Sequence, residues 1–332
     1  MSGLKIAVIM GGTSFERDFS LKSGKYICSA LKQAGHNPVP LDADSNLVDT
    51  LLAESPDLAF ICVHGMGGED GTIPSLLEFL RIPYVGSRPA TCRAAWNKPD
   101  IPFILQRAES SFFKDNAWPQ EVALPARAFR DLGAAKALDL VGERILAGYP
   151  LAVKPARGGS AMGVSKVESQ EGLGQAIMGA LAFDDTVLIQ AWVEGVELSC
   201  TVVEQAGEIE VLPLVEISAK DGIYDTSCRI TPGSTDYYCP ARLDSLANSL
   251  DEVNAAMAKI KECARDVFRA YGCRDFARID VIWDADKVRV LDIKTFPGMA
   301  ETSLVPMAVA ATGHTMSEFC HSLVMAAYSR GC

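Results

Sequence analysis

Strand-like and helix-like patterns alternate over the first ninety residues, and this alternation restricts the possible folds more than any other feature of the sequence. Lys5–Met10 is a nearly continuous apolar run, and Arg17–Gln33 has the spacing of a helix. The pattern continues with a strand near Pro38–Leu41, a helix at Asn46–Ala53, a buried strand at Leu58–Val63 and a helix at Ser75–Leu80 that Pro74 introduces. Strands and helices in this order predict a parallel sheet wrapped by helices, which is the α/β class.

The remainder of the chain contains more strands that follow one another directly. Between Asp100 and Tyr149, helical patches mix with connections that contain proline. The later segments are predicted as strands at Leu151–Lys154, Val164–Val167, Val187–Trp192, Glu197–Val203 and Ile209–Ile217, a polar loop over 218–240, a helix at Leu250–Tyr271, a hairpin of Ala277–Trp283 with Val288–Ile293, and a closing helix at Met316–Tyr328. This order predicts α+β organisation in the C-terminal half.

Length and charge exclude several classes of protein. A chain of 332 residues is too long for one simple core and predicts two or three domains. A net charge of −11 argues against a nucleic-acid partner, although a single nucleotide needs only a few lysines and a metal. No apolar stretch approaches the roughly 20 residues of a membrane span, and the N-terminus lacks the layout of a signal peptide. We therefore expect a cytoplasmic protein with no membrane partner.

The cysteines carry no sign of metal or disulfide chemistry. None of the ten is spaced as C-x-x-C, and most lie inside apolar segments. We expect them to be small buried side chains.

Two glycine-rich loops follow predicted strands of the N-terminal region. The first, Gly11–Ser14, precedes Glu16, and the second runs from His64 to Thr72 with four glycines, a glutamate and an aspartate. Loops at the carboxyl ends of parallel strands commonly bind ligands. The spacing is not the G-x-G-x-x-G of a dinucleotide fold, which disfavours a dehydrogenase. A generic tight turn and a structural histidine are the alternatives.

Lys154 ends an apolar strand and is followed by the loop Gly158–Gly163. An ammonium beside flexible backbone N–H groups is suited to gripping a phosphate. The loop lacks G-K-[ST], so it is not a Walker loop. The alternative is a surface lysine near a hairpin.

The C-terminal hairpin carries four charged residues at alternate positions. Arg278 and Asp280 face one side of their strand, as do Asp292 and Lys294 of the next. If the strands pair, the two carboxylates can share a hard cation such as Mg²⁺. A cross-strand salt bridge on a solvated face is the alternative. The turn Thr295–Met299 follows and offers a backbone N–H as an oxyanion donor.

Taken in order, these segments resemble the D-alanine–D-alanine ligases over nearly the whole chain. The matching stretches are GGTSFERDFSLKSG from Gly11, HGMGGEDGTIPSLLE from His64, PYVGS from Pro83, AVKPARGGSAMGVSKV from Ala152, VEGVELSCTVV from Val193, ARIDV from Ala277 and PGMAETSLVPMA from Pro297. Seven collinear matches are a highly specific signal, which any one of them alone is not.

The resemblance implies a three-domain ATP-grasp architecture, with an N-terminal domain at 1–98, a central domain at 99–195 and a C-terminal domain at 196–332. It implies ATP as cosubstrate, Mg²⁺ or Mn²⁺ as metal, a homodimer, and a role in making peptidoglycan precursors. The implied reaction has two steps: one D-alanine carboxylate takes the γ-phosphoryl group, and the amine of a second D-alanine displaces phosphate from the acyl phosphate.

Roles carried over from the family fall on sixteen residues. Glu16 would hold the ammonium of the first substrate, with His64 lining its pocket and Ser160 in the closing loop. Lys98 and Lys154 would bind ATP phosphates, Glu197 the ribose, and Gln190, Trp192 and Val193 would edge the adenine pocket. Asp280 and Asp292 would hold the metal, Arg278 and the Gly298 N–H would stabilise the oxyanion, and Arg229, Ser303 and Leu304 would contact the second substrate.

The chain departs from the family pattern at three places. Arg229-Ile230 replaces a Lys-Tyr pair, Ala161 replaces a second serine, and Asp292 and Lys294 replace a Glu and an Asn. A charged lysine has no lone pair and cannot ligate a metal. We therefore expect one protein-bound Mg²⁺ centred on Asp280 and Asp292, with the Lys294 ammonium near the place of a second ion.

Two other functions stay open at this point. In the first, the chemistry is the same but the acceptor is D-lactate, D-serine or another amine, because the altered loop would contact the acceptor pocket. A nucleotide-binding pseudo-ligase without turnover is the other, and the presence of Lys98, Lys154, Glu197, Arg278 and Asp280 favours an enzyme over it.

The Ile230→Tyr variant tests the most unusual of these positions. Isoleucine cannot donate a hydrogen bond, so the link between Glu16 and Ser160 lacks the tyrosine that is its third member in the family. We expect Ile230→Tyr to raise the rate with D-alanine as acceptor, measured as phosphate release. An unchanged rate, in a protein that is already fast with D-alanine, would show that another contact holds the loop.

Overall fold

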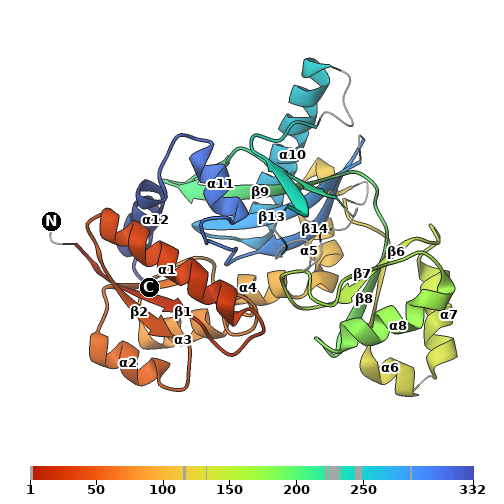
Figure 1. The fold of residues 1–332 in the computed structure, drawn as a ribbon, viewed down its shortest axis with the longest axis horizontal. Coiled ribbons are helices and arrows are strands. Elements are labelled where there is room, and N and C mark those ends of the chain that lie inside the picture. Colours follow the sequence, from red (N-terminus) through yellow and green to blue (C-terminus); the bar gives the residue numbers. More distant parts are fainter. Residues whose placement is uncertain are drawn as a thin grey trace.

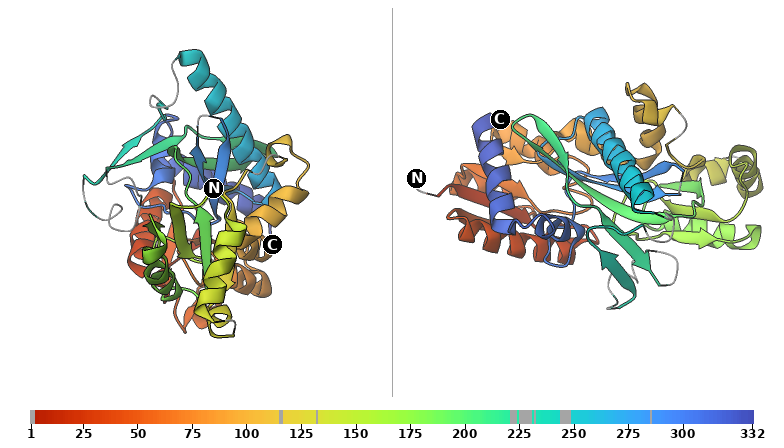
Figure 2. Two further views of the ribbon diagram at one scale, coloured as in Figure 1. Left: turned by 90° about the vertical axis from the view of Figure 1, so that its right-hand side faces the viewer. Right: turned by 90° about the horizontal axis from the view of Figure 1, so that it is seen from above.

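The computed structural model describes residues 3–114, 117–131, 133–220, 224, 231, 233–243, 249–284 and 286–332. Its strands form three sheets that follow one another along the molecule (Figure 1). Seen from above, in Figure 2, the two four-stranded sheets lie at opposite ends with the six-stranded sheet between them. Neighbouring sheets can therefore enclose a site between them.

The first sheet is parallel, as the alternating pattern predicts. Its order is β2(Asn37–Asp42)-β1(Lys5–Met10)-β3(Leu58–Ile61)-β4(Tyr84–Val85). Its helices are α1(Arg17–Gln33), α2(Leu47–Glu54), α3(Thr72–Leu80) and α4(Pro89–Trp96).

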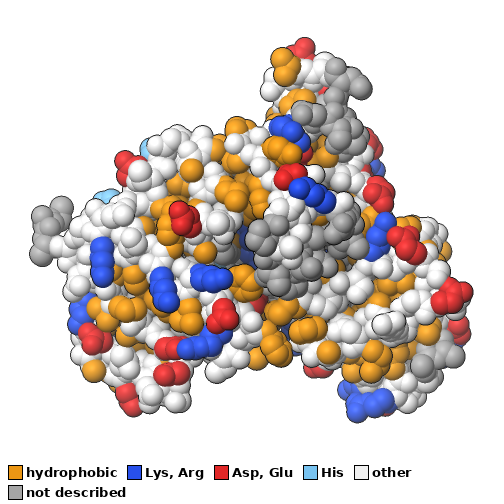
Figure 3. Space-filling model, viewed as in Figure 1, with side chains coloured by type: hydrophobic (Ala, Val, Ile, Leu, Met, Phe, Trp, Pro, Cys, Tyr) orange, Lys and Arg blue, Asp and Glu red, His pale blue; other side chains and the backbone are white. Residues whose placement is uncertain are grey.

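Both faces of the first sheet are buried. Ile6 and Val8 of β1 pack in one cluster with residues of α1 and of α12(Met316–Arg330), whereas Ala7 and Ile9 pack in another with residues of α2 and α3. Two covered faces explain why β1 is apolar at successive positions. The outer face of α1 is exposed, and basic side chains gather over it in Figure 3.

The other two sheets are antiparallel. The second is ordered β5(Glu121–Pro125)-β8(Thr186–Ala191)-β6(Leu151–Pro155)-β7(Ser165–Val167), and α6(Ala126–Asp131), α7(Ala134–Arg144) and α8(Gln170–Leu181) belong to the same region. The third is ordered β12(Thr235–Tyr238)-β11(Val215–Ala219)-β9(Val196–Gln205)-β13(Phe276–Trp283)-β14(Val288–Lys294), with β10(Glu208–Val211) also paired to β9. The predicted α/β fold with α+β organisation in its C-terminal half is confirmed.

Two predictions about the segment after β9 are wrong. The single strand expected at Ile209–Ile217 is two strands, β10 and β11, which pair with different parts of β9. Pro213 lies between them, and proline has no N–H to donate to a ladder. The polar loop expected over 218–240 contains β12, whose Thr235 and Tyr237 are β-prone and pair with β11.

Two helices pack against a sheet of a different predicted domain from their own. α5(Ile101–Arg107) contributes Ile101 and Leu105 to the core formed by the third sheet and α10(Leu250–Tyr271). The last helix, α12, packs against α1 and the first sheet. The preceding helix, α11(Leu304–Ala310), contacts both α12 and the third sheet. Each sheet takes all its strands from one predicted range, while the boundaries 98/99 and 195/196 stay predictions. No helix within the described ranges is long and apolar enough to span a bilayer.

Gly86, at the end of β4, supplies a stability test. It has a φ of +119°, and a Cβ there would lie 2.3 Å from Phe296 Cε1. We expect Gly86→Ala to destabilise the protein by about 2–4 kcal/mol, through backbone strain and overpacking against a buried ring. The loss is measured as a lower thermal midpoint by circular dichroism.

Gly174→Ala in α8 is the matched control, because a Cβ there meets nothing within 4 Å. Removing a glycine from a helix interior should stabilise the protein by roughly 0.5–1 kcal/mol. Equal midpoints for the two variants would contradict the proposed packing of Phe296 on Gly86.

Candidate active site

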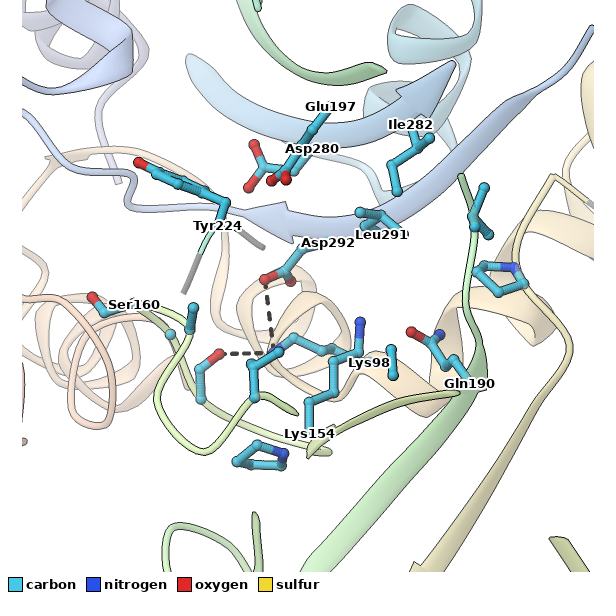
Figure 4. Close-up of a pocket in the computed structure, with 18 of the residues that line it drawn as sticks. Lys98, Lys154, Ser160, Gln190, Glu197, Tyr224, Asp280, Ile282, Leu291 and Asp292 are labelled. Atoms are coloured by element: carbon cyan, nitrogen blue, oxygen red, sulfur yellow. Dashed lines mark hydrogen bonds and ion pairs between the residues drawn. The ribbon is translucent and has the colours of Figure 1, made fainter. Parts of the chain in front are cut away.

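A cavity between the second and third sheets gathers ten of the sixteen predicted site residues. Its walls include Lys98, Lys154, Ser160, Gln190, Trp192, Val193, Glu197, Arg278, Asp280 and Asp292. In Figure 4, Asp280 and Asp292 come from the third sheet, whereas Lys154 and Gln190 come from the second. The predicted nucleotide and metal groups thus share one space with Arg278, one of the two predicted oxyanion groups, whereas Gly298 does not line it.

Two lysines give this cavity an excess of positive charge. Lys98 is 6% exposed, and its Nζ donates to the Gly158 carbonyl at 2.7 Å and lies 3.7 Å from Asp292. Burial lowers the pKa of Lys98 to about 8 and also lowers the pKa of Lys154. Within the described ranges, Lys154 forms no ion pair with a carboxylate within 4 Å. An incoming polyanion would relieve the cost of burying both ammonium groups.

Apolar side chains line the same cavity. Ile282 and Leu291 of the third sheet lie across from Gln190, whose Nε2 donates to Glu121 at 2.5 Å. Leu291 would face away from Asp292 in a regular strand, but Asp280 pairs with Asp292 and Val281 with Val290, which leaves Leu291 as the extra residue of a bulge. The bulge lets both Leu291 and Asp292 line the cavity.

The predicted charge pairs of the hairpin are confirmed, and they are buried. Arg278 donates Nε to Asp280 at 2.8 Å and Nη2 at 2.7 Å, and Lys294 Nζ lies 3.2 Å from Asp292. Arg278 is 6% exposed and Asp280 8%, so the alternative of a salt bridge on a solvated face is wrong. Burial alone would lower the pKa of Arg278, but the Asp280 carboxylate outweighs it and raises that pKa.

Whether Asp280 and Asp292 can bind a divalent cation depends on the charged groups around them. Burial would raise the pKa of Asp292, but Lys294, Lys98 and Lys154 hold it at about 2, so the carboxylate is ionised. The parts of the chain that the structure describes contain no group of three or more His, Cys, Asp or Glu able to hold an ion. Two carboxylates suit one Mg²⁺ whose remaining ligands are phosphate oxygens and water.

Glu16 meets the loop that follows β6. It is 4% exposed and accepts a hydrogen bond from the Ser160 hydroxyl. A Cβ on Gly65 would lie 2.5 Å from Glu16 Oε2, and one on Gly159 would lie 2.7 Å from Oε1. Gly65 has a φ of +72°, which favours glycine, whereas a Cβ on Gly159 would displace the Glu16 carboxylate. A second cavity, lined by Glu16, Gly65 and Gly159, shares Gly158, Gly159 and Met162 with the first.

His64 lies at the end of β3 and touches the turn after β14. Its Nδ1 donates to the Phe296 carbonyl at 3.0 Å, and its Nε2 accepts from the Ser23 hydroxyl at 2.8 Å. Ser23 Oγ in turn accepts the Met299 N–H at 3.1 Å. His64 thus connects β3 to the turn carrying Gly298, and it lines neither of the two cavities described above.

The predicted acceptor residues are less closely gathered. Ser303 is the N-cap of α11, its Oγ lies 3.1 Å from where a Cβ on Gly298 would stand, and Leu304 is the buried first residue of that helix. Arg229 lies outside the described residues, as does Ile230.

Some lining residues were not predicted from the sequence. Ile282 follows Asp280 at the spacing of one strand face, so the alternation could have found it, whereas Leu291 needed the bulge. Lys294 was predicted as one of four charged residues of the hairpin and as a departure from the family, and Glu69 only as one residue of a polar loop. The structure pairs them at 3.2 Å.

Comparisons with known proteins agree with this geometry. Family models of the D-ala D-ala ligase N-terminus and C-terminus match residues 45–87 and 133–325. A D-alanine–D-alanine ligase of Desulforudis audaxviator is 35% identical over 327 residues, which cover 98% of this chain and 99% of the relative. The chain belongs to the D-alanine–D-alanine ligase family.

Solved structures of ligases of this kind have the same fold. A D-alanine–D-alanine ligase from Bacillus anthracis superposes with a TM-score of 0.78 at 25% identity, covering 99% of this chain and 98% of that one. A D-Ala:D-Ser ligase from Enterococcus faecalis superposes with a TM-score of 0.77 at 25% identity, covering 98% and 99%. The ATP-grasp architecture implied by the resemblance is thereby confirmed.

Lys154→Ala tests the phosphate end of the cavity. The lost charge-assisted contact is worth about 1.5–3 kcal/mol, so we expect a roughly ten- to hundredfold rise in the KM for ATP, or loss of turnover, with an unchanged circular dichroism spectrum. Lys136→Ala is the control, because the Lys136 side chain in α7 is 61% exposed. Normal ATP turnover by Lys154→Ala would contradict the assignment.

Proposed function

We propose that this protein is an ATP-dependent ligase that joins two D-alanines through an acyl phosphate for peptidoglycan precursor synthesis. The observation that carries the proposal is the adjacency of two sites. A cavity with buried lysines and apolar walls meets, across the Gly158–Met162 loop, a carboxylate held between two glycines. The first suits a nucleotide and the second the ammonium of an amino acid.

In the proposed reaction, Lys98 and Lys154 hold the phosphates, and Glu16 holds the ammonium of the first D-alanine. A carboxylate oxygen of this first D-alanine bonds to the γ-phosphorus of ATP. The bond between the γ-phosphorus and the bridging oxygen of the β-phosphate breaks and releases ADP. The ammonium of the second D-alanine loses a proton to solvent, and the resulting amine bonds to the carbonyl carbon. The C–O bond to phosphate then breaks, and the nitrogen loses a second proton to the departing inorganic phosphate. Arg278 and the Gly298 N–H stabilise the oxyanion formed between these events.

The proposal includes one Mg²⁺ or Mn²⁺, which Asp280 and Asp292 would hold together with the nucleotide. When bound, the cation neutralises charge on the transferring phosphoryl group. The homodimer, the cytoplasmic location and the individual site roles rest on family membership and belong to the same proposal.

A different acceptor is the second candidate. The chain superposes about as well on a D-Ala:D-Ser ligase as on a D-alanine–D-alanine ligase, with TM-scores of 0.77 and 0.78. Residues 229–230 also depart from the family pattern in the loop expected to contact the acceptor. Fold similarity therefore does not choose between the two acceptors.

An acceptor panel tests both candidates. Phosphate release is measured with ATP, Mg²⁺ and D-alanine alone, and then with D-serine or D-lactate added, while mass spectrometry identifies the product. We expect D-alanyl-D-alanine to dominate and Lys154→Ala to abolish it. Faster mixed-product formation would assign the second candidate, and no phosphate release with any amino acid would contradict ligase activity.

A further inference from the structure

Lys294 is a buried cation with partners on three separate segments. It is 6% exposed and lies at the end of β14. Its Nζ lies 3.2 Å from Asp292 of its own strand, 3.2 Å from Glu69 in the loop after β3, and 3.1 Å from the carbonyl of Gly158, to which it donates a hydrogen bond. One ammonium thus joins the third sheet to a loop of the first and a loop of the second.

The charge of Lys294 is already committed to the protein. Two carboxylates stand against its single positive charge, whereas Lys154 pairs with no carboxylate within the described ranges. Lys154 is therefore suited to phosphate, whereas Lys294 holds protein groups. Lys98 shares two of those groups, because it donates to the same Gly158 carbonyl at 2.7 Å and lies 3.7 Å from Asp292.

Both loops that Lys294 holds lead directly to Glu16. Glu69 uses its other oxygen, Oε1, to accept the Gly65 N–H at 3.1 Å, and Gly65 lies against Glu16 Oε2. Gly158 precedes Gly159, which lies against Glu16 Oε1. The Lys294 ammonium is thus linked to Gly65 through Glu69, and to Gly159 through the neighbouring Gly158.

We propose that Lys294 is a positioning residue that sets the two glycine walls around Glu16 and so couples the nucleotide cavity to the amino-acid site. The inference rests on the proposed function for the identity of the amino acid. It assigns Glu69 as the second member of the coupling. Removing the ammonium leaves the buried Glu69 carboxylate without its counter-charge and leaves Asp292 and Gly158 with Lys98 alone. The Gly65–Glu69 loop is then released and the Gly158 loop is held less firmly.

The first test is the Lys294→Met variant, which keeps the length of the side chain and removes its charge. Because the walls of the Glu16 site loosen while Lys98 and Lys154 stay, we expect the KM for D-alanine to rise about ten- to hundredfold, the effect of leaving buried polar groups unsatisfied. The dissociation constant of ADP, measured by calorimetry with Mg²⁺, should change by less than about threefold. Lys294→Arg should recover part of the lost D-alanine affinity.

Glu69→Gln and the double variant complete a cycle. If the pair acts as a unit, the double variant should raise the KM for D-alanine no more than Lys294→Met alone. Lys5 of β1 and Glu54 of α2, whose charged groups are 2.8 Å apart, give the control cycle Lys5→Met and Glu54→Gln, with no expected change in the KM for D-alanine. A rise in the ADP dissociation constant that matches the rise in KM would overturn the inference, because Lys294 would then be a phosphate ligand.

Amide hydrogen exchange separates this inference from the proposed function, since it needs no turnover. In ligand-free Lys294→Met we expect faster exchange at Gly65–Glu69 and Gly158–Ser160 than in the unchanged protein, and normal exchange in the Lys5→Met control. Unchanged exchange at both loops would contradict the inference even if the protein is an active ligase. Faster exchange in a protein that ligates no amino acid would keep the coupling and reject the ligase proposal.

Discussion

The antiparallel pairing of β13 with β14 is the constraint on which the site depends. It sets Arg278 opposite Lys294 and Asp280 opposite Asp292, and it carries the bulge at Leu291. These charged groups are largely removed from water, and breaking one such buried pair costs about 3–5 kcal/mol. The hairpin therefore tolerates charges here only because each one has a partner. Both carboxylates line the cavity beside these partners.

The carboxylate of Glu16 lies between glycines of two loops. Gly65 and Gly159 approach it from opposite loops, at distances that no Cβ would allow. Close approach of two backbones to a charged group excludes water and strengthens any electrostatic contact made there. A substrate ammonium in this place would meet a carboxylate whose position is fixed by Ser160 and by both loops.

The first and third sheets are joined by polar contacts as well as by packing. Asp275, before β13, is 2% exposed and accepts from the Gly86 N–H at 2.7 Å and from Arg330 Nη2 at 3.0 Å. His64 reaches the Phe296 carbonyl from the end of β3. These contacts connect the end of the first sheet to both ends of the hairpin and to the last helix. The turn with Gly298 is thereby held against the N-terminal region, where Glu16 lies.

The sequence by itself determined the elements whose signal is local. The apolar run of β1, the helix Leu250–Tyr271 with Gly272 in the left-handed conformation after it, and the hairpin all stand where periodicity and turn chemistry put them. Motif order was enough to identify the family and ten of the residues that line the main cavity. Tertiary structure alone decided which groups meet across the sheets. The bulge that turns Leu291 inward, the division of Ile209–Ile217 into two strands, and the three partners of Lys294 all depend on pairing between segments far apart in the chain. Local patterns specify how a segment folds, but the contacts of a buried charge are set by whichever distant groups the packed sheets bring within reach.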